Sequence, residues 1–179
     1  SKLFIDSIKP WVYSGYEDST SCANPTINST SNAIIFSKIG SGTRNADLFI
    51  SKLSNGEWSE PFAIDQLNTA LNEVYPFFMG DSLLTFSSNG YPGYGGLDIY
   101  NVRPTDFSNL NHYKEPINSY MDDFNFIYTS QNQARFTSNR SVLIEGSHSN
   151  QFIGGDDDIY TYTTNKEIED TDSIDQFEY

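Results

Sequence analysis

The sequence predicts an all-β protein assembled from repeated antiparallel sheets. Three observations support this prediction. Ser, Asn, Thr, Asp and Gly are abundant, Phe and Tyr are frequent at 13 and 12 residues, and the same short phrases return about every fifty residues. Turn-forming polar residues placed between aromatic runs favour short strands over helices. At 179 residues, the chain is long enough for one domain with its own core.

A phrase of an apolar residue, Phe and Ser or Thr marks each repeat. It occurs as "IIFS", "LTFS" and "ARFTS", and a Gly-, Ser- or Asn-rich gap follows each copy. After the gap comes an acidic residue directly before an apolar-aromatic pair. These structural repeat positions are Phe36, Phe86, Phe136, Asp47, Asp98 and Asp158. An acid in such a turn can accept hydrogen bonds from nearby backbone N–H groups, and its recurrence favours a structural role.

Each repeat is expected to contain four strands. The first strands are "NPTIN", "YPFFM" and "FNFIY", and tight turns join them to the Phe-containing second strands. The third strands are "DLFISKL", "DIYNV" and "DIYTYT", and the fourth lie around "EWSEP" and its counterparts. Leu48 and Phe49 point to opposite faces of a strand, so both faces are apolar and need cover. Stacked four-stranded sheets with this period are typical of β-propeller blades.

The predicted propeller module covers residues 1–165, with about three blades and an N-terminal partial blade. Its third and fourth strands come first, within 2–16, and the blades follow at about 23–64, 74–117 and 124–164. The last blade carries an insertion, "SVLIEGSHSNQFIGG", between its second and third strands. Because three blades and a fraction do not close a ring, we expect a fragment of a longer propeller or an arc completed by another chain.

The C-terminal segment 166–179 is acidic, with six acids and one Lys. One interpretation is a solvated tail, as charge runs usually are. The other is that Ile168, Ile174 and Phe177 allow the segment to serve as the missing fourth strand of the last blade. The sequence leaves both open.

The phrases "FSSNGYPGYGGLDIY", "PINSYMDDFNF" and "GGDDDIY" resemble TolB-type, WD40-like propeller repeats. They are especially similar to repeats in OmpA-associated cell-envelope proteins of Bacteroidetes-type bacteria. The resemblance covers roughly residues 2–163. It implies a periplasmic, outer-membrane-associated or secreted interaction module beside other domains of a longer parent protein, and it brings no catalytic residues with it.

Charge and hydropathy exclude several partners. The formal net charge of −14 and only ten Lys and Arg residues argue against nucleic acid and against an anionic membrane surface. No run of about 18 apolar residues is long enough to span a bilayer. Cys22 is the single cysteine, so no disulfide can form within the chain.

Candidate chemistry is sparse, and we expect neither a catalytic residue nor a bound cofactor. Calcium is the cation that the acidic run before Ile159 suggests, with Asp156 and Asp157 as the better ligands, but turn formation is the favoured role. Both histidines are expected in surface loops. Glu73 and Asp123 occupy matching repeat positions, where we expect them to bind backbone amides. Alternatively, loop carboxylates of this kind would serve a carbohydrate-active, hydrolase-associated propeller.

Recognition through loops is therefore the leading functional prediction. Tyr91 and Tyr94 lie in the "GYPGYGG" loop, and His148 and Asn150 lie in the insertion. Tyr and Asn are typical of adaptable recognition surfaces for proteins or glycans. For Tyr91 and Tyr94, packing within the fold is an equally good explanation.

Overall fold

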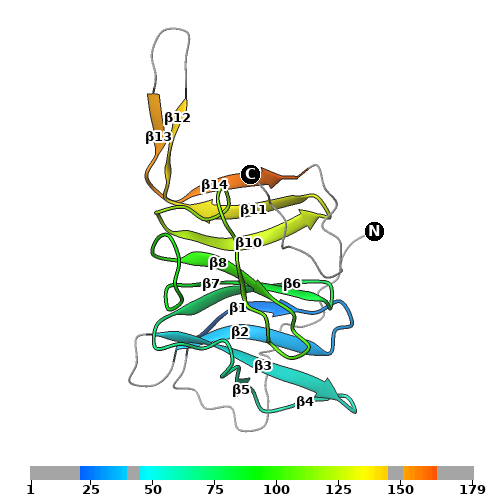
Figure 1. The fold of residues 1–179 in the computed structure, drawn as a ribbon. Coiled ribbons are helices and arrows are strands. Elements are labelled where there is room, and N and C mark those ends of the chain that lie inside the picture. The colour runs from blue at the N-terminus through cyan, green and yellow to red at the C-terminus, as the bar shows by residue number, and fades with distance from the viewer. Residues whose placement is uncertain (1–20, 40–44, 145–150, 165–179) are drawn as a thin grey trace, which may run out of the picture.

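The computed structural model of the chain describes residues 21–39, 45–144 and 151–164. Within these ranges every regular element is a β-strand and no helix occurs, which confirms the all-β prediction. The described part accordingly contains no helix that is long and apolar enough to cross a membrane. The strands form three successive antiparallel sheets and a separate two-stranded hairpin (Figure 1).

The first sheet contains β1 (Ser21–Ile27), β2 (Ala33–Ile39), β3 (Ala46–Ser54), β4 (Glu57–Trp58) and β5 (Phe62–Ala63). The first four strands are neighbours in space in the order of the sequence, and β5 also pairs with β3. The predicted fourth strand is therefore split into two short pieces. Pro61 lies in the break, and it has no N–H group to donate to a neighbouring strand.

The middle and last sheets follow the same plan. The middle sheet contains β6 (Glu73–Met79), β7 (Leu83–Ser88), β8 (Asp98–Val102) and β9 (Asn111–His112). The last sheet contains β10 (Asp123–Ser130), β11 (Gln133–Ser138) and β14 (Asp158–Thr163). The predicted insertion folds as the hairpin of β12 (Ser141–Ile144) and β13 (Gln151–Gly154), which projects from the last sheet (Figure 1). The strands expected within 2–16 and the segment 166–179 lie outside the described residues.

The second and third strands pair in one register in all three sheets. Phe36 stands opposite Phe49, Phe86 opposite Tyr100, and Phe136 opposite Tyr160. The rings of each pair are stacked, with centroids 6.3, 5.9 and 5.7 Å apart. Phe36, Phe86 and Phe136 are buried, and the three occupy equivalent places in the fold.

The first strand of each sheet is bulged at the same place. Asn24, Tyr75 and Asn125 have φ angles of 53°, 54° and 56°, and the pairing register shifts beside each of them. A bulge frees backbone groups from their own sheet. The Asn125 N–H donates to the hydroxyl of Ser87 in the preceding sheet at 3.3 Å. Because Tyr75 is neither Gly nor Asn, nothing in its residue type signals this conformation.

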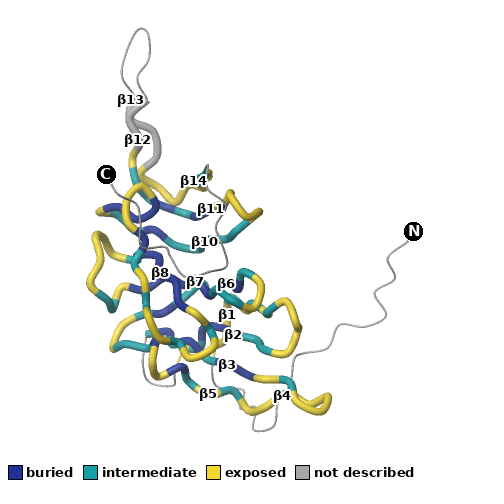
Figure 2. The backbone as a smooth tube through the Cα atoms, turned by 45° about the vertical axis from the view of Figure 1, so that its right-hand side comes forward, coloured by how far each residue is buried: buried dark blue, intermediate teal, exposed yellow. Residues whose placement is uncertain are grey.

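The middle sheet lies between the first and the last sheets (Figure 2), and apolar side chains of both neighbours cover its two faces. One apolar cluster joins the first and middle sheets, and a second joins the middle and last sheets. Between the middle and last sheets, the rings of Tyr75 and Phe124 stack at 5.2 Å. Burial is therefore deepest in the middle sheet, where all five residues of β8 are buried.

In each of the first two sheets, one asparagine side chain hydrogen-bonds to the backbone of the third strand. We name these two residues, Asn68 and Asn118, the latch asparagines. The Asn68 side chain accepts from the Leu48 N–H (2.8 Å) and donates to the Leu48 carbonyl (3.0 Å). Asn118 makes the same two bonds to Ile99, at 2.8 and 2.9 Å. A side-chain amide carries both a donor and an acceptor, so it can replace a backbone partner at a sheet edge. Leu48 and Ile99 are completely buried beneath these latches.

Candidate functional site

A buried carboxylate shapes the connection between β7 and β8, residues 89–97, which we name the Tyr94 loop. Asp98 is 1% exposed, and its Oδ2 accepts hydrogen bonds from the backbone N–H groups of Tyr94 (3.0 Å) and Gly95 (3.1 Å). A Cβ atom on Gly93 would lie 2.0 Å from this carboxylate, which explains the glycine there. The acid of the third strand thus holds the preceding loop, as its position predicts.

Tyr94 is the exposed aromatic residue of this loop. Its side chain is 49% exposed, and its ring lies 4.9 Å from the imidazole of His112 on β9. His112 contacts the ring of Tyr100 at 4.9 Å, and its Nε2 lies 3.3 Å from Asp98 Oδ1. Asp98 therefore positions both the backbone of Tyr94 and the imidazole that contacts its ring.

The connection between β9 and β10, residues 113–122, supports the Tyr94 loop from the side. The Leu97 N–H donates to Asp122 Oδ1 at 2.7 Å, and a Cβ atom on Gly95 would lie 1.9 Å from the Met121 carbonyl oxygen. This second loop carries Tyr120, which is 75% exposed. Two loops with one exposed tyrosine each are thus held in direct contact.

Tyr91 has a different role from Tyr94. It is half-buried, its hydroxyl donates to the Leu67 carbonyl at 2.9 Å, and its ring packs against Phe86 and Tyr100. Burial raises the pKa of the Tyr91 hydroxyl, and the charge of Glu73 adds to the shift. The hydroxyl and ring of Tyr91 are thus occupied within the fold, which leaves Tyr94 as the candidate for recognition in this loop.

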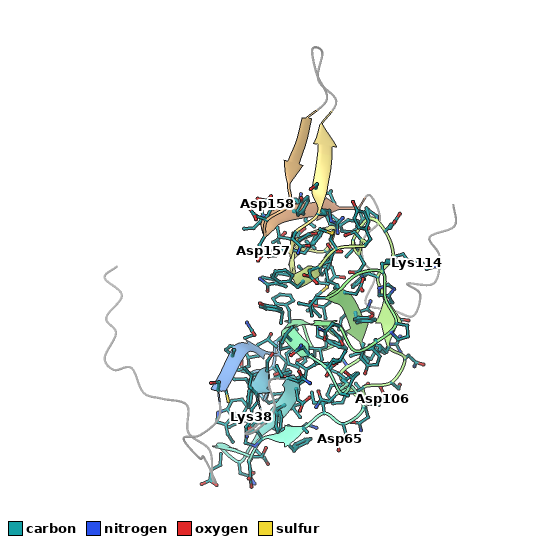
Figure 3. All side chains as sticks on the ribbon, turned by 90° about the vertical axis from the view of Figure 1, so that its left-hand side faces the viewer. Lys38, Asp65, Asp106, Lys114, Asp157 and Asp158 are labelled. Atoms are coloured by element: carbon teal, nitrogen blue, oxygen red, sulfur yellow. The ribbon has the colours of Figure 1, made fainter. Side chains whose placement is uncertain are left out.

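The two equivalents of Asp98 lie in other environments. Asp47 is half-buried, and burial together with the charges of Glu73 and Asp65 raises its pKa. Asp158 is exposed, at the outer edge of the last sheet beside the base of the β12–β13 hairpin (Figure 3). Repetition in the sequence therefore does not make the three acids equivalent in the structure.

Glu73 and Asp123 are completely buried, and each binds the loop just before it. Glu73 accepts from the backbone N–H (2.9 Å) and hydroxyl (2.7 Å) of Thr69. Asp123 accepts from the N–H (2.6 Å) and hydroxyl (2.8 Å) of Ser119 and forms an ion pair with Arg140. Both carboxylates bind backbone amides, as predicted. This use of their oxygens argues against their acting as an acid–base pair on a substrate.

The acidic run at the end of the β12–β13 hairpin is open to solvent. Asp156, Asp157 and Asp158 are all exposed, and Figure 3 shows the last two at the surface. Within the described ranges, no three His, Cys, Asp or Glu side chains gather closely enough to hold a metal ion. The predicted binding residues His148 and Asn150 lie outside those ranges.

Sequence reasoning missed His112 and Tyr120. His112 was expected to be an ordinary loop histidine, but it stands opposite Tyr100 in the pairing of β8 with β9. Its place in the segment predicted to form the fourth strand is a usable signal that it pairs with the third strand. Tyr120 has no comparable signal, because its exposure depends on how two loops meet. No family model matches the sequence, and no curated protein is similar enough to match it.

Proposed function

We propose that the chain is a non-enzymatic β-propeller module of a bacterial envelope or secreted protein and that it binds protein partners or envelope glycans through its loops. Three sheets with one strand order and one register, stacked face to face, support the propeller part of this proposal. The envelope location rests on the resemblance of the repeat phrases to TolB-type propellers.

The observation that carries the binding role is the exposed ring of Tyr94, which packs against His112 at a centroid distance of 4.9 Å. An imidazole packs against the ring, and Asp98 accepts a hydrogen bond from the Tyr94 backbone N–H, so little freedom is lost when a ligand binds. Tyrosine offers an apolar ring and a hydroxyl together. Tyr120 on the adjoining loop adds a second such surface.

No observation favours the alternative of a hydrolase-associated propeller. That function needs two carboxyl groups facing a substrate across a cleft. Glu73 and Asp123 are instead buried and bonded to Thr69 and Ser119.

The test is a binding comparison between the wild-type chain, Tyr94→Ala and Tyr120→Ala. Each variant is immobilised and exposed to a panel of envelope oligosaccharides and to solubilised envelope proteins. We expect Tyr94→Ala to lose about thirtyfold or more in affinity for whichever probe the wild type retains, because an aromatic side chain that becomes buried under a ligand contributes about 2 kcal/mol or more. The loss at Tyr120→Ala is expected to be smaller, since none of the described residues places a ring against it as His112 does against Tyr94.

Phe62→Ala is the matched control, because Phe62 is an aromatic residue with nearly the same exposed fraction, 50%, on the first sheet. Gly95→Ala is the second variant. It forces the two loops apart without removing an aromatic ring, and it should also weaken binding. Equal affinity of Tyr94→Ala and Phe62→Ala would move the binding surface away from the Tyr94 loop.

A further inference from the structure

The last sheet has an edge that the described residues leave open. In the first sheet β3 pairs with β4 and β5, and in the middle sheet β8 pairs with β9. β14 is the equivalent strand of the last sheet. It pairs with β11 on one side, and no described strand lies on its other side.

Ile159 marks this open edge. It stands opposite Thr137, just as Leu48 stands opposite Ser37 and Ile99 opposite Ser87. Leu48 and Ile99 are 0% exposed, but Ile159 is 76% exposed. Among the three equivalent apolar side chains, those of Leu48 and Ile99 are buried and that of Ile159 is exposed to solvent.

The backbone of Ile159 faces the open edge as well. The N–H groups of Leu53 and Thr164 donate to the carbonyls of Asn32 and Asn132, in the turns before the second strands, at 2.8 and 3.0 Å. Leu53 lies as far beyond Leu48 as Thr164 lies beyond Ile159. Because backbone N–H groups point alternately to the two sides of a strand, the N–H groups of Leu48 and Ile159 point to the same side of their sheets. The Leu48 N–H points away from the second strand toward Asn68. The Ile159 N–H therefore points to the side where a fourth strand would lie.

The end of the chain repeats the fourth strand of the first sheet. Residues 164–179, "TNKEIEDTDSIDQFEY", align without a gap on residues 54–69, "SNGEWSEPFAIDQLNT". Identical residues occupy the aligned pairs Asn55 and Asn165, Glu57 and Glu167, Ile64 and Ile174, Asp65 and Asp175, and Gln66 and Gln176. Phe177 takes the place of Leu67. Chance is a poor explanation for a match that ends in the run Ile-Asp-Gln followed by an apolar residue.

In the first sheet, the residues copied at the end of the chain cover Leu48. The Ile64 N–H donates to the Leu48 carbonyl at 2.9 Å, and Ile64 and Leu67 are 1% and 0% exposed. Just before Ile64, Ala63 of β5 pairs with Phe49 of β3. The same segment thus completes the sheet and buries its third strand.

We propose that residues 165–179 dock on the open edge of β14 as the fourth strand of the last sheet, with Ile174 and Phe177 covering Ile159. The segment is long enough for this role. Glu178 stands as far beyond Ile159 as Asn118 stands beyond Ile99, so the chain reaches the position from which Asn118 bonds to the third strand of the middle sheet. The proposal concerns the last sheet alone and does not depend on ligand binding at Tyr94.

Two features make this docking weaker than its counterpart in the first sheet. Glu178 replaces the latch Asn68, and an ionised carboxylate accepts from an N–H but cannot donate to a carbonyl. Asp175 would also approach Asp158, as Asp65 approaches Asp47. The first sheet tolerates that pair of acids, and added salt screens it, so salt should strengthen docking.

The experiment measures amide hydrogen exchange by NMR in the whole 179-residue chain. We compare the wild type with I174S/F177S, reading the amides of Ile159 and Thr161 and using the buried Ile99 amide as an internal reference. The Ile159 and Thr161 amides should exchange about tenfold or more faster in I174S/F177S, with Ile99 unchanged. A peptide of residues 165–179 added to the variant should restore the protection, and the same peptide carrying I174S/F177S should not.

The control variant E169S/D172S removes two charges from the segment and keeps both apolar side chains, so its Ile159 amide should stay protected. Fast exchange at Ile159 in the wild type, unaffected by I174S/F177S, would overturn the proposal. Protection that survives I174S/F177S and rises with protein concentration would also overturn it, since a second copy would then be the occupant.

Discussion

Strands β8 and β14 begin with the same phrase, Asp-Ile-Tyr, and pair with their second strands in the same register. All five residues of β8 are buried, yet Ile159 of β14 is 76% exposed. The difference comes from what lies beside each strand: β9, the Asn118 latch and the last sheet cover β8. The same short sequence is therefore buried in one sheet and exposed in another, because the burial of a strand depends on the elements that pack against it.

The middle and last sheets also differ in the side chain that hydrogen-bonds to the connection before each sheet. In the middle sheet, the Tyr91 hydroxyl donates to the Leu67 carbonyl. In the last sheet, the Arg140 guanidinium donates to the carbonyl of Ile117, the matching residue of the next connection. Arg140 also lies 5.1 Å over the ring of Phe136. A tyrosine and an arginine side chain can serve the same purpose here, because each combines a hydrogen-bond donor with a flat group that packs on an aromatic ring.

The largest loss of stability is expected when the buried carboxylates of the two sheets are removed. Asp123→Ala leaves the Arg140 guanidinium without its carboxylate, so it should lower the free energy of unfolding by about 3 kcal/mol or more. Glu73→Ala removes hydrogen bonds only from Thr69 and Ser88, and about 2 kcal/mol is expected. Urea unfolding measures both, and Asp123→Asn serves if the alanine variant does not fold. A larger loss at Glu73 would contradict this ranking.

The next effect compares Ile99 with Ile159 directly. Ile99→Ala should cost about 2–5 kcal/mol of unfolding free energy, because the residue is fully buried. Ile159→Ala in the I174S/F177S background should change it by no more than about 0.5 kcal/mol, as for an exposed site. In the wild-type background the cost should be larger, and this excess is the coupling between Ile159 and the C-terminal segment. If Ile159→Ala costs the same in both backgrounds, Ile159 and the C-terminal segment do not interact.

The smallest effect distinguishes Tyr100 from its equivalent Tyr160. Burial raises the pKa of Tyr100 far above its usual value, with Asp98 and Tyr91 adding to the shift. Burial and Asp158 also raise the pKa of Tyr160, but the charge of Arg140 opposes this. An unfolded tyrosine ionises near pH 10, whereas the folded one keeps its proton to higher pH. The unfolding free energy should therefore fall as pH rises above about 10.

The measurement is the unfolding free energy at about pH 9 and about pH 11 for the wild type, Tyr100→Phe and Tyr160→Phe. Tyr100→Phe should reduce the alkaline loss of stability more than Tyr160→Phe does. Equal reductions would mean that the two tyrosines share one electrostatic environment despite their different neighbours.

Several details of the site were accessible to sequence reasoning because they are local. The carboxylates of Glu73 and Asp123 bind loops only four residues before them, and Asp98 binds the loop directly before its strand. The distinction between Tyr91 and Tyr94 was not accessible. It depends on the Leu67 carbonyl, which comes from the connection between two sheets.

By itself, the sequence determined the strand class, the repeat spacing and the register of Phe36, Phe86 and Phe136, because alternation and turn chemistry act over a few residues. Only the tertiary structure decided which copy of each repeated residue is buried, which tyrosine reaches solvent, and where a bulge turns Tyr75. Those outcomes depend on contacts between sheets some fifty residues apart, and a local pattern carries no record of them.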